Sequence, residues 1–179
     1  APDRIETCTE ALLRATARAG RELGVPVRLH CCQGGFEVET VRRLHGRTPI
    51  EWLRDLSFLD QRTLLPHGTH VTPSRTCPGP GDDLAIIRDH GSAIVHCPLV
   101  AARFGAALAS FRRYRALGLR LGLGTDTAPP DLVLGMQVGL MLCRVMEGEP
   151  EACRAEDYFD AATLGGADAL HRPDLGRIE

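Results

Sequence analysis

Three histidines and one aspartate stand at the ends of four apolar runs and are the residues best suited to chemistry. The runs cover residues 25–30, 63–67, 92–96 and about 117–126, and they end on His30, His67, His96 and Asp126. Imidazole and carboxylate are the ligand types of catalytic zinc and iron sites. Parallel α/β enzymes carry their catalytic groups at the carboxyl ends of strands. If the four runs are neighbouring parallel strands, these residues indicate a catalytic or metal site.

The spacing of the runs predicts a repeated strand–helix unit. Their final residues lie about 30 to 37 positions apart, which is the length of one strand, one helix and their loops. Apolar residues at helical spacing, together with start and stop signals, predict helices over residues 6–23, 82–91, 108–117 and 132–146. Alternating strands and helices predict a parallel sheet with helices outside it.

Four strand–helix units make about half of an eight-unit barrel. An intact barrel takes about 250 residues, whereas this chain has 179. We therefore predict an α/β fold with parallel strands that forms part of a (β/α)8 TIM barrel. The spacing leaves one alternative open, a small doubly wound domain in which the histidines at the strand ends are incidental.

Short motifs around the later strand ends occur in one order along the chain. They are His67-Gly68-Thr69-His70, His96-Cys97-Pro98 and Gly122-Leu123-Gly124-Thr125-Asp126, followed by residues 161–170 and 175–179. This series resembles the amidohydrolase superfamily, in its branch of chlorohydrolases and nucleobase or triazine aminohydrolases. The resemblance covers nearly the whole chain and implies strands five to eight of the barrel, with an exit toward a small β-domain.

The family's opening His-x-His pair, which supplies two metal ligands from strand one, has no counterpart in this chain. None of the seven histidines forms a pair with that spacing. We therefore expect residues 1–179 to be an internal segment of a metal-dependent hydrolase domain, without the N-terminal half-barrel and the small β-domain. A naturally compact half-barrel with a reduced metal site is the alternative.

A second departure from the family lies at Gln33, where relatives usually have a glutamate that shuttles a proton to the substrate. An amide can donate or accept a hydrogen bond but cannot transfer a proton at neutral pH. Three explanations stay open: the substrate needs no such transfer, another group such as His67 performs it, or the protein is a weak catalyst. Gln33 therefore argues against a simple guanine or cytosine deaminase.

The resemblance implies roles for the residues at three strand ends. His30 and Asp126 would bind one divalent metal ion, zinc in the first place and iron as the alternative. Asp126 would also accept the proton of the metal-bound water, and His67 would polarise the bond under attack. The implied reaction is that of a deaminase or dechlorinase, in which metal-bound hydroxide attacks a C–N or C–Cl bond of a nitrogen heterocycle.

Three further residues are expected to bind the substrate by the same resemblance. They are Gln33, His96 and Arg103, the last in a loop where many relatives carry a different segment. For His96 a supporting structural role is an equal alternative. For Arg103 the equal alternative is a helix cap or a salt bridge.

Composition fits a cytoplasmic enzyme. The chain is 44% hydrophobic with a formal net charge of -2 and a pI of about 6.4, and it has no apolar run long enough to span a bilayer. Because no basic cluster is present, a nucleic-acid partner is not expected. We expect a small heterocyclic substrate and a homodimer of the full-length protein. Seven cysteines, an odd number with Cys31 and Cys32 adjacent, argue against a disulfide framework.

Two other functions stay open at this point. The chain could belong to a cyclic-amide hydrolase, for which the missing glutamate would matter less. It could also be a catalytically inactive barrel remnant that serves as an interaction module.

Overall fold

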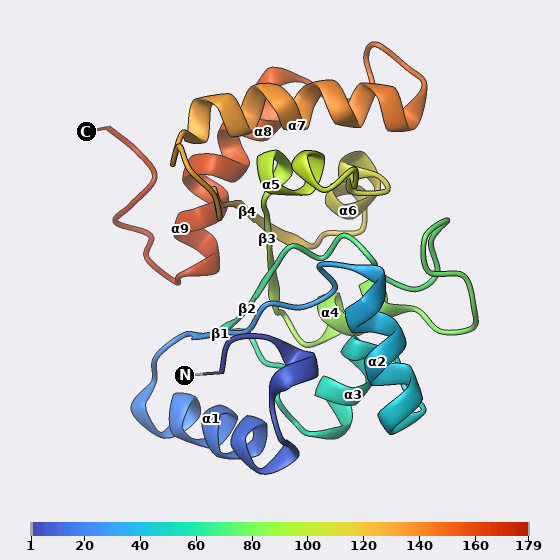
Figure 1. The fold of residues 1–179 in the computed structure, drawn as a ribbon. Coiled ribbons are helices and arrows are strands. Elements are labelled where there is room, and N and C mark those ends of the chain that lie inside the picture. Colours follow the sequence, from blue (N-terminus) through green and yellow to red (C-terminus); the bar gives the residue numbers. More distant parts are fainter. Residues whose placement is uncertain (1, 179) are drawn as a thin grey trace.

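Four short parallel strands form the centre of the computed structural model, which describes residues 2–178 (Figure 1). The strands are hydrogen-bonded to one another in chain order: β1 (Val27–Arg28), β2 (Thr63–Pro66), β3 (Ala93–His96) and β4 (Arg120–Leu123). Each lies within one of the four predicted runs. The α/β fold with parallel strands is therefore confirmed.

The outer edge of β1 is partly covered by the segment before the first helix. Arg4 forms a parallel bridge with His30, and the His30 amide donates to the Asp3 carbonyl at 3.0 Å. The prediction of a helix from residue 6 is wrong at its start, because a 3-10 turn, η1 (Ile5–Thr7), comes first. Helix α1 (Glu10–Leu23) then begins after Thr9, whose side chain accepts a hydrogen bond from the Leu12 amide.

Helices fill the connections between the strands. They are α2 (Gly35–His45) and α3 (Pro49–Asp55) after β1, α4 (Asp83–Asp89) after β2, α5 (Pro98–Arg103) and α6 (Phe111–Ala116) after β3, and α7 (Leu132–Glu147), α8 (Ala155–Asp160), the π-helical η2 (Ala161–Gly165) and α9 (Gly166–Ala169) after β4. The predicted helices at 82–91, 108–117 and 132–146 correspond to α4, α6 and α7. The segment with Arg103, expected to be a loop, is helix α5. Among the described residues, no helix is both long and apolar enough to cross a membrane.

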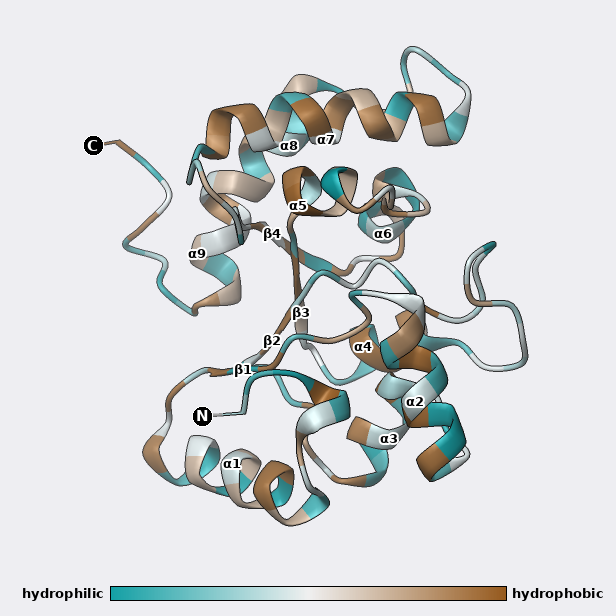
Figure 2. Ribbon diagram, viewed as in Figure 1, coloured by the Kyte–Doolittle hydropathy of each residue, from teal (hydrophilic) through white to brown (hydrophobic). Residues whose placement is uncertain are grey.

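The two faces of the sheet have different surroundings. Leu65, Ile94 and Leu121 are register partners on three adjacent strands, and all three are buried in the core with apolar side chains of the helices. Figure 2 shows α1 banded in teal and brown, as expected for a helix with one face on this core. On the opposite face the partners Val95 and Gly122 line an open cavity. The sheet is therefore packed on its helical side and hollow on the other.

One disulfide links Cys143 in α7 to Cys153 just before α8. The cysteine count argued against a disulfide framework, and this single link was missed. The two residues are 10 positions apart on either side of the turn at Gly148. Only the fold places them together, because nothing in that local spacing predicts a pair.

Candidate metal and catalytic site

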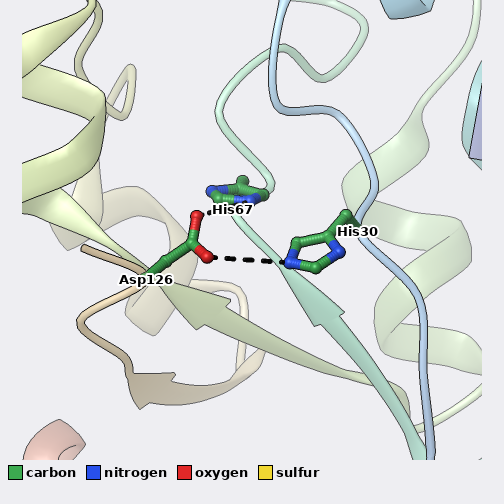
Figure 3. A group of neighbouring side chains, drawn as sticks. All are labelled: His30, His67 and Asp126. Carbon is green, nitrogen blue, oxygen red and sulfur yellow. Dashed lines mark ion pairs between the residues drawn. The ribbon is translucent and has the colours of Figure 1, made fainter. Parts of the chain in front are cut away.

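His30, His67 and Asp126 converge beyond the carboxyl ends of β1, β2 and β4 (Figure 3). Asp126 Oδ1 lies 3.8 Å from His30 Nε2, and its Oδ2 lies 3.5 Å from His67 Nε2. The two imidazole rings stack with their centroids 5.3 Å apart. One nitrogen or oxygen from each residue lies within 4.8 Å of the others, so a single ion could contact all three.

The backbone turns sharply at two of these residues. His67 has a φ of 82° and Asp126 a φ of 44°, both in the left-handed region that side chains other than glycine rarely adopt. The His67 amide still donates to the Val95 carbonyl at 2.9 Å, which holds the turn against β3. Such conformations persist where the surroundings impose them and cluster at functional sites.

The ring of His30 is oriented by the chain beside it. Its Nδ1 lies 2.9 Å from the backbone carbonyl of Asp3. Because a carbonyl oxygen only accepts, Nδ1 donates this hydrogen bond, and Nε2 is the ring nitrogen that faces Asp126. Metal-binding histidines commonly show this arrangement.

His67 is buried, and one of its ring nitrogens makes no hydrogen bond within the described residues. Its side chain is 2% exposed, and its Nε2 has no hydrogen-bond partner among the described residues. Burial lowers the pKa of His67 to about 4, although the Asp126 carboxylate opposes that shift. Two imidazoles and a carboxylate are ligand types that suit zinc and also iron, so the residues fit the metal that the sequence predicts.

Two cavities meet at these residues. The first, the front pocket, has a volume of about 350 Å³ and is lined by His67, Gln33, Phe36, Glu37 and Phe104, among others. The second, the rear cavity, has a volume of about 370 Å³ on the hollow face of the sheet, with His30 and Asp126 in its wall. A ligand in either cavity would lie beside the three residues.

Residues 2–179 match the sequence profile described as the amidohydrolase family. The chain belongs to this family. It is 30% identical to a 5-methylthioadenosine/S-adenosylhomocysteine deaminase of Nitratidesulfovibrio vulgaris over 100% of this chain and 40% of that relative. A protein of the same name from Halobacterium salinarum is 31% identical, over 99% of this chain and 40% of the relative. The chain thus spans about 40% of the length of the curated relatives it matches.

Solved structures of the same family share the fold. An adenosine deaminase of Xanthomonas campestris with bound zinc superposes with a TM-score of 0.88 at 24% identity, over 99% of this chain and 40% of that one. A mutant atrazine chlorohydrolase of Arthrobacter aurescens, complexed with zinc and atraton, has a TM-score of 0.85 at 26% identity, over 99% and 39%. The amidohydrolase fold, as part of a larger barrel, is therefore shown for this chain.

Gln33 lies in this family member's front pocket, but the other two residues predicted to bind substrate line neither cavity. His96 is 2% exposed, and its ring centroid lies 6.1 Å from that of Phe111. Arg103 is exposed and donates to the Thr127 hydroxyl, next to Asp126. His96 is buried with its Nδ1 unpaired among the described residues, and a hydrogen bond holds Arg103, so their contacts with substrate stay predictions.

Two residues that sequence reasoning did not single out support the site. Asp3 orients His30 through its backbone carbonyl, and its carboxylate lies 3.2 Å from the same ring nitrogen. Glu37 lines the front pocket and accepts hydrogen bonds from the amides of Cys32 and Gln33. The only signal for Glu37 was an acidic residue shortly after His30, in a segment where no helix was predicted.

Proposed function

We propose that this chain belongs to a hydrolase that replaces an amino or chlorine substituent of a nitrogen heterocycle, with an adenosine-type nucleoside as the first candidate substrate. One observation carries the proposal: the unpartnered Nε2 of buried His67 faces Asp126 and His30. The names of the relatives, deaminases of adenosine derivatives and a triazine chlorohydrolase, support the substrate class.

His30 and Asp126 would hold one divalent ion, zinc in the first place, through Nε2 and a carboxylate oxygen. When bound, such an ion lowers the pKa of a water molecule to about 7 and so supplies hydroxide at neutral pH. A carboxylate beside the ion can take up the proton released, so this role falls to Asp126, whose Oδ2 lies 3.5 Å from His67 Nε2. His67, neutral and shielded from solvent, stabilises the charge that develops on the substrate.

Gln33 has a role in this proposal that differs from that of a glutamate. Its side-chain oxygen is buried without a hydrogen-bond partner in the described part of the chain, and the residue lines the front pocket. That oxygen is free to accept a hydrogen bond from an N–H of the substrate but cannot supply a proton. The proton for the leaving group would then come from Asp126, because neutral His67 has no proton to transfer.

A substrate screen tests the proposal. We would measure ammonia release from adenosine, 5-methylthioadenosine and S-adenosylhomocysteine, and chloride release from a chlorotriazine, together with the zinc and iron content. We expect turnover that requires metal and that Asp126→Asn lowers about 1,000-fold. Asp131→Asn is the matched control, because Asp131 caps α7 five residues later. Undiminished turnover in Asp126→Asn would contradict the proposal.

Gln33 also favours a second candidate, the hydrolysis of a cyclic amide, for which no proton shuttle to a ring nitrogen is required. A panel of lactams beside the heterocycles separates the two reactions. Gln33→Glu sharpens the result: a gain in nucleobase deamination would map the family's proton shuttle onto this position. No turnover of any substrate by the metal-loaded protein would instead support an inactive interaction module.

The organisation of the protein belongs to the same proposal. We propose that residues 1–179 act as the second half of a barrel in a cytoplasmic homodimer. Native mass spectrometry of the natural gene product tests this by giving chain length, oligomeric state and bound metal in one spectrum. Cell fractionation tests the location.

A further inference from the structure

Cys31, Cys32 and Glu37 form a second cluster of metal-binding atoms that shares no ligand with His30, His67 and Asp126. The two sulfur atoms lie 3.8 Å apart, and a carboxylate oxygen of Glu37 lies within 4.8 Å of both. The cysteines are 0% exposed and Glu37 is 4% exposed. The cluster follows His30 directly in the chain but has a different chemistry, because it contains sulfur.

The backbone explains how two adjacent cysteines come to share one side. Successive residues of an extended chain point to opposite faces, whereas Cys32 has a left-handed φ of 59°. The loop after β2 holds this conformation, because the amides of Thr69 and His70 both donate to the Cys32 carbonyl at 2.9 Å. The Gly68 amide likewise donates to the Cys31 carbonyl at 3.1 Å. The paired orientation of the thiols is thus built into the fold.

Glu37 faces the thiols without a cation in hydrogen-bond contact among the described residues. Its carboxylate accepts hydrogen bonds from the amides of Cys32 and Gln33, the latter at 2.9 Å. A carboxylate has about four acceptor positions, so two remain for a ligand bond. Burial raises the pKa of Glu37 to about 7 against the two backbone hydrogen bonds, with Glu6 adding to the rise and Arg4 opposing it. A buried acid in this position gains from a bound cation.

We propose that Cys31, Cys32 and Glu37 form a site for one thiophilic divalent cation of the zinc or cadmium class. Two sulfurs bound at about 2.3 Å to one tetrahedral ion lie about 3.8 Å apart, which matches the observed separation. Binding forms two metal–sulfur bonds and releases the two thiol protons to solvent. Glu37 also lines the front pocket, so that pocket provides the entry path and a water molecule for the fourth position.

Cadmium titration of the metal-free protein tests the proposal, because only thiolate ligands produce the sulfur-to-cadmium absorption band. We expect the band to saturate at one ion per chain. Cys31→Ser and Cys32→Ser should each weaken cadmium binding at this site at least 100-fold or abolish the band. Cys8→Ser, outside the cluster, should leave it unchanged, and circular dichroism checks that each variant is folded.

Two results would overturn the proposal. The first is a band that persists in both serine variants, or its absence in the wild type. The second is loss of the band in Cys97→Ser, because Cys97 lies with His30 and Asp126 in the rear cavity and would then be the sulfur ligand. Cadmium-113 NMR of the wild-type protein gives an answer that needs no variant: a resonance typical of thiolate ligation is expected, and only nitrogen- and oxygen-type resonances would contradict it.

Discussion

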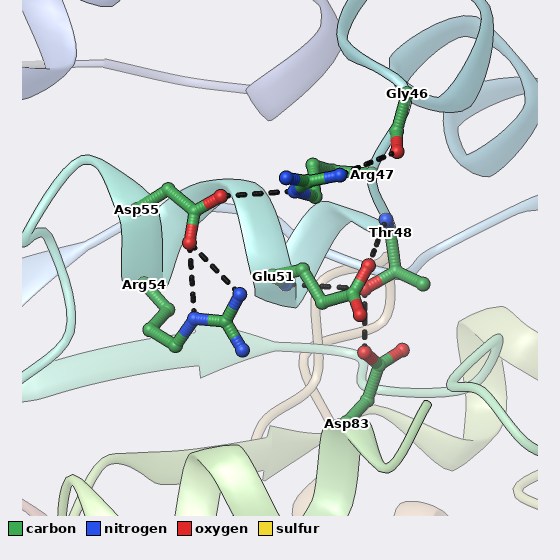
Figure 4. Close-up of polar contacts among 7 residues, drawn as sticks. All are labelled: Gly46, Arg47, Thr48, Glu51, Arg54, Asp55 and Asp83. Carbon is green, nitrogen blue, oxygen red and sulfur yellow. Dashed lines mark hydrogen bonds and ion pairs between the residues drawn. The ribbon is translucent and has the colours of Figure 1, made fainter. Parts of the chain in front are cut away.

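Two groups of polar side chains near the same sheet differ in how completely their atoms are paired. In the first, His67 Nε2 is buried without a hydrogen-bond partner among the described residues, 3.5 Å from Asp126. In the second, Asp83 is 0% exposed, yet one of its oxygens accepts from the Thr48 hydroxyl at 2.5 Å (Figure 4). Its other oxygen accepts from the Thr72 amide at 2.8 Å. Buried polar groups are normally paired. The unpaired nitrogen of His67, which converges with His30 and Asp126, therefore indicates a ligand site, whereas the paired carboxylate of Asp83 indicates a structural role.

The Asp83 network, meaning Thr48, Glu51, Thr72 and Asp83, joins three segments of the chain. Thr48 and Glu51 form a capping box at the start of α3, and Asp83 lies in the first turn of α4. Thr72 belongs to the loop after β2, which follows His67, and its hydroxyl accepts a hydrogen bond from Arg42 at 2.7 Å. We expect this network to hold the loops in place and to take no part in the reaction.

The largest effect is expected when the carboxylate of Asp126 is replaced. Asp126→Asn keeps the shape of the side chain but removes its charge and its capacity to hold a proton. We expect kcat/KM on the substrate found in the screen to fall about 1,000-fold, or about 4 kcal/mol, with stability changed by less than about 0.5 kcal/mol. Steady-state kinetics and urea denaturation of the same preparation check this. A large loss of stability would place Asp126 with the structural residues.

Asp83→Ala should have the opposite effect, a loss of stability rather than a loss of metal binding. It removes an acceptor from two buried donors, so we expect a loss of about 3 kcal/mol in the free energy of unfolding. The metal content of the folded protein should stay the same. Asp82→Ala is the matched control: exposed Asp82 caps α4, and its loss should cost about 1 kcal/mol. If Asp83→Ala and Asp82→Ala lowered the free energy of unfolding equally, the buried hydrogen bonds of Asp83 would stabilise the fold no more than an exposed helix cap does.

The pH dependence of stability sharpens the same comparison. Burial raises the pKa of Asp83 from 3.8 to about 6 against the hydrogen bonds from Thr48 and Thr72, with Glu51 adding to the rise and Arg42 opposing it. Because the folded state binds this proton more tightly, its stabilising contribution is complete below about pH 4 and is lost as the pH rises through about 6.

The measurement is the difference in unfolding free energy between the wild type and Asp83→Asn from pH 4 to 7. The wild type should lose on the order of 2 kcal/mol relative to the variant over this range. Burial also raises the pKa of Glu37, to about 7. That group is present in both proteins and cancels in the difference. A flat difference curve would show that Asp83 does not hold its proton in the folded state.

Features that depend on the local order of residues, such as strand ends and helix starts, could be predicted from the sequence. A polar residue that ends an apolar run marks a strand end, so the convergence of His30, His67 and Asp126 could be anticipated. A helix was predicted to start at residue 82, and the Asp82 side chain caps α4. The part played by its neighbour Asp83 depends on Thr48, 35 positions away, and no local pattern reveals that contact.

Other features depended on tertiary structure in the same way. Helices α2 and α3 were not predicted, because several charged residues interrupt their apolar positions. The left-handed backbone at His67 and Cys32 is imposed by neighbouring strands and loops. His96 ends a strand like the others, but its side chain is enclosed by the core. The type of residue at a strand end therefore predicts a candidate site residue. Whether its side chain reaches the site or is enclosed by the core depends on packing.

The smallest expected effect is at Thr48, which joins the capping of α3 to the Asp83 network. Its hydroxyl accepts from the Glu51 amide at 3.1 Å while donating to Asp83 at 2.5 Å. Thr48→Val keeps the volume but removes both bonds, so we expect a loss of about 1.5 kcal/mol in the free energy of unfolding. Thr48→Ser keeps the hydroxyl and should cost less than about 1 kcal/mol, the value of one buried methyl group. If Thr48→Ser unfolds at a lower urea concentration than Thr48→Val, the methyl group rather than the hydrogen bonds stabilises this corner. If Thr48→Val also lowered turnover, the Asp83 network would have to be counted with the residues that position His67.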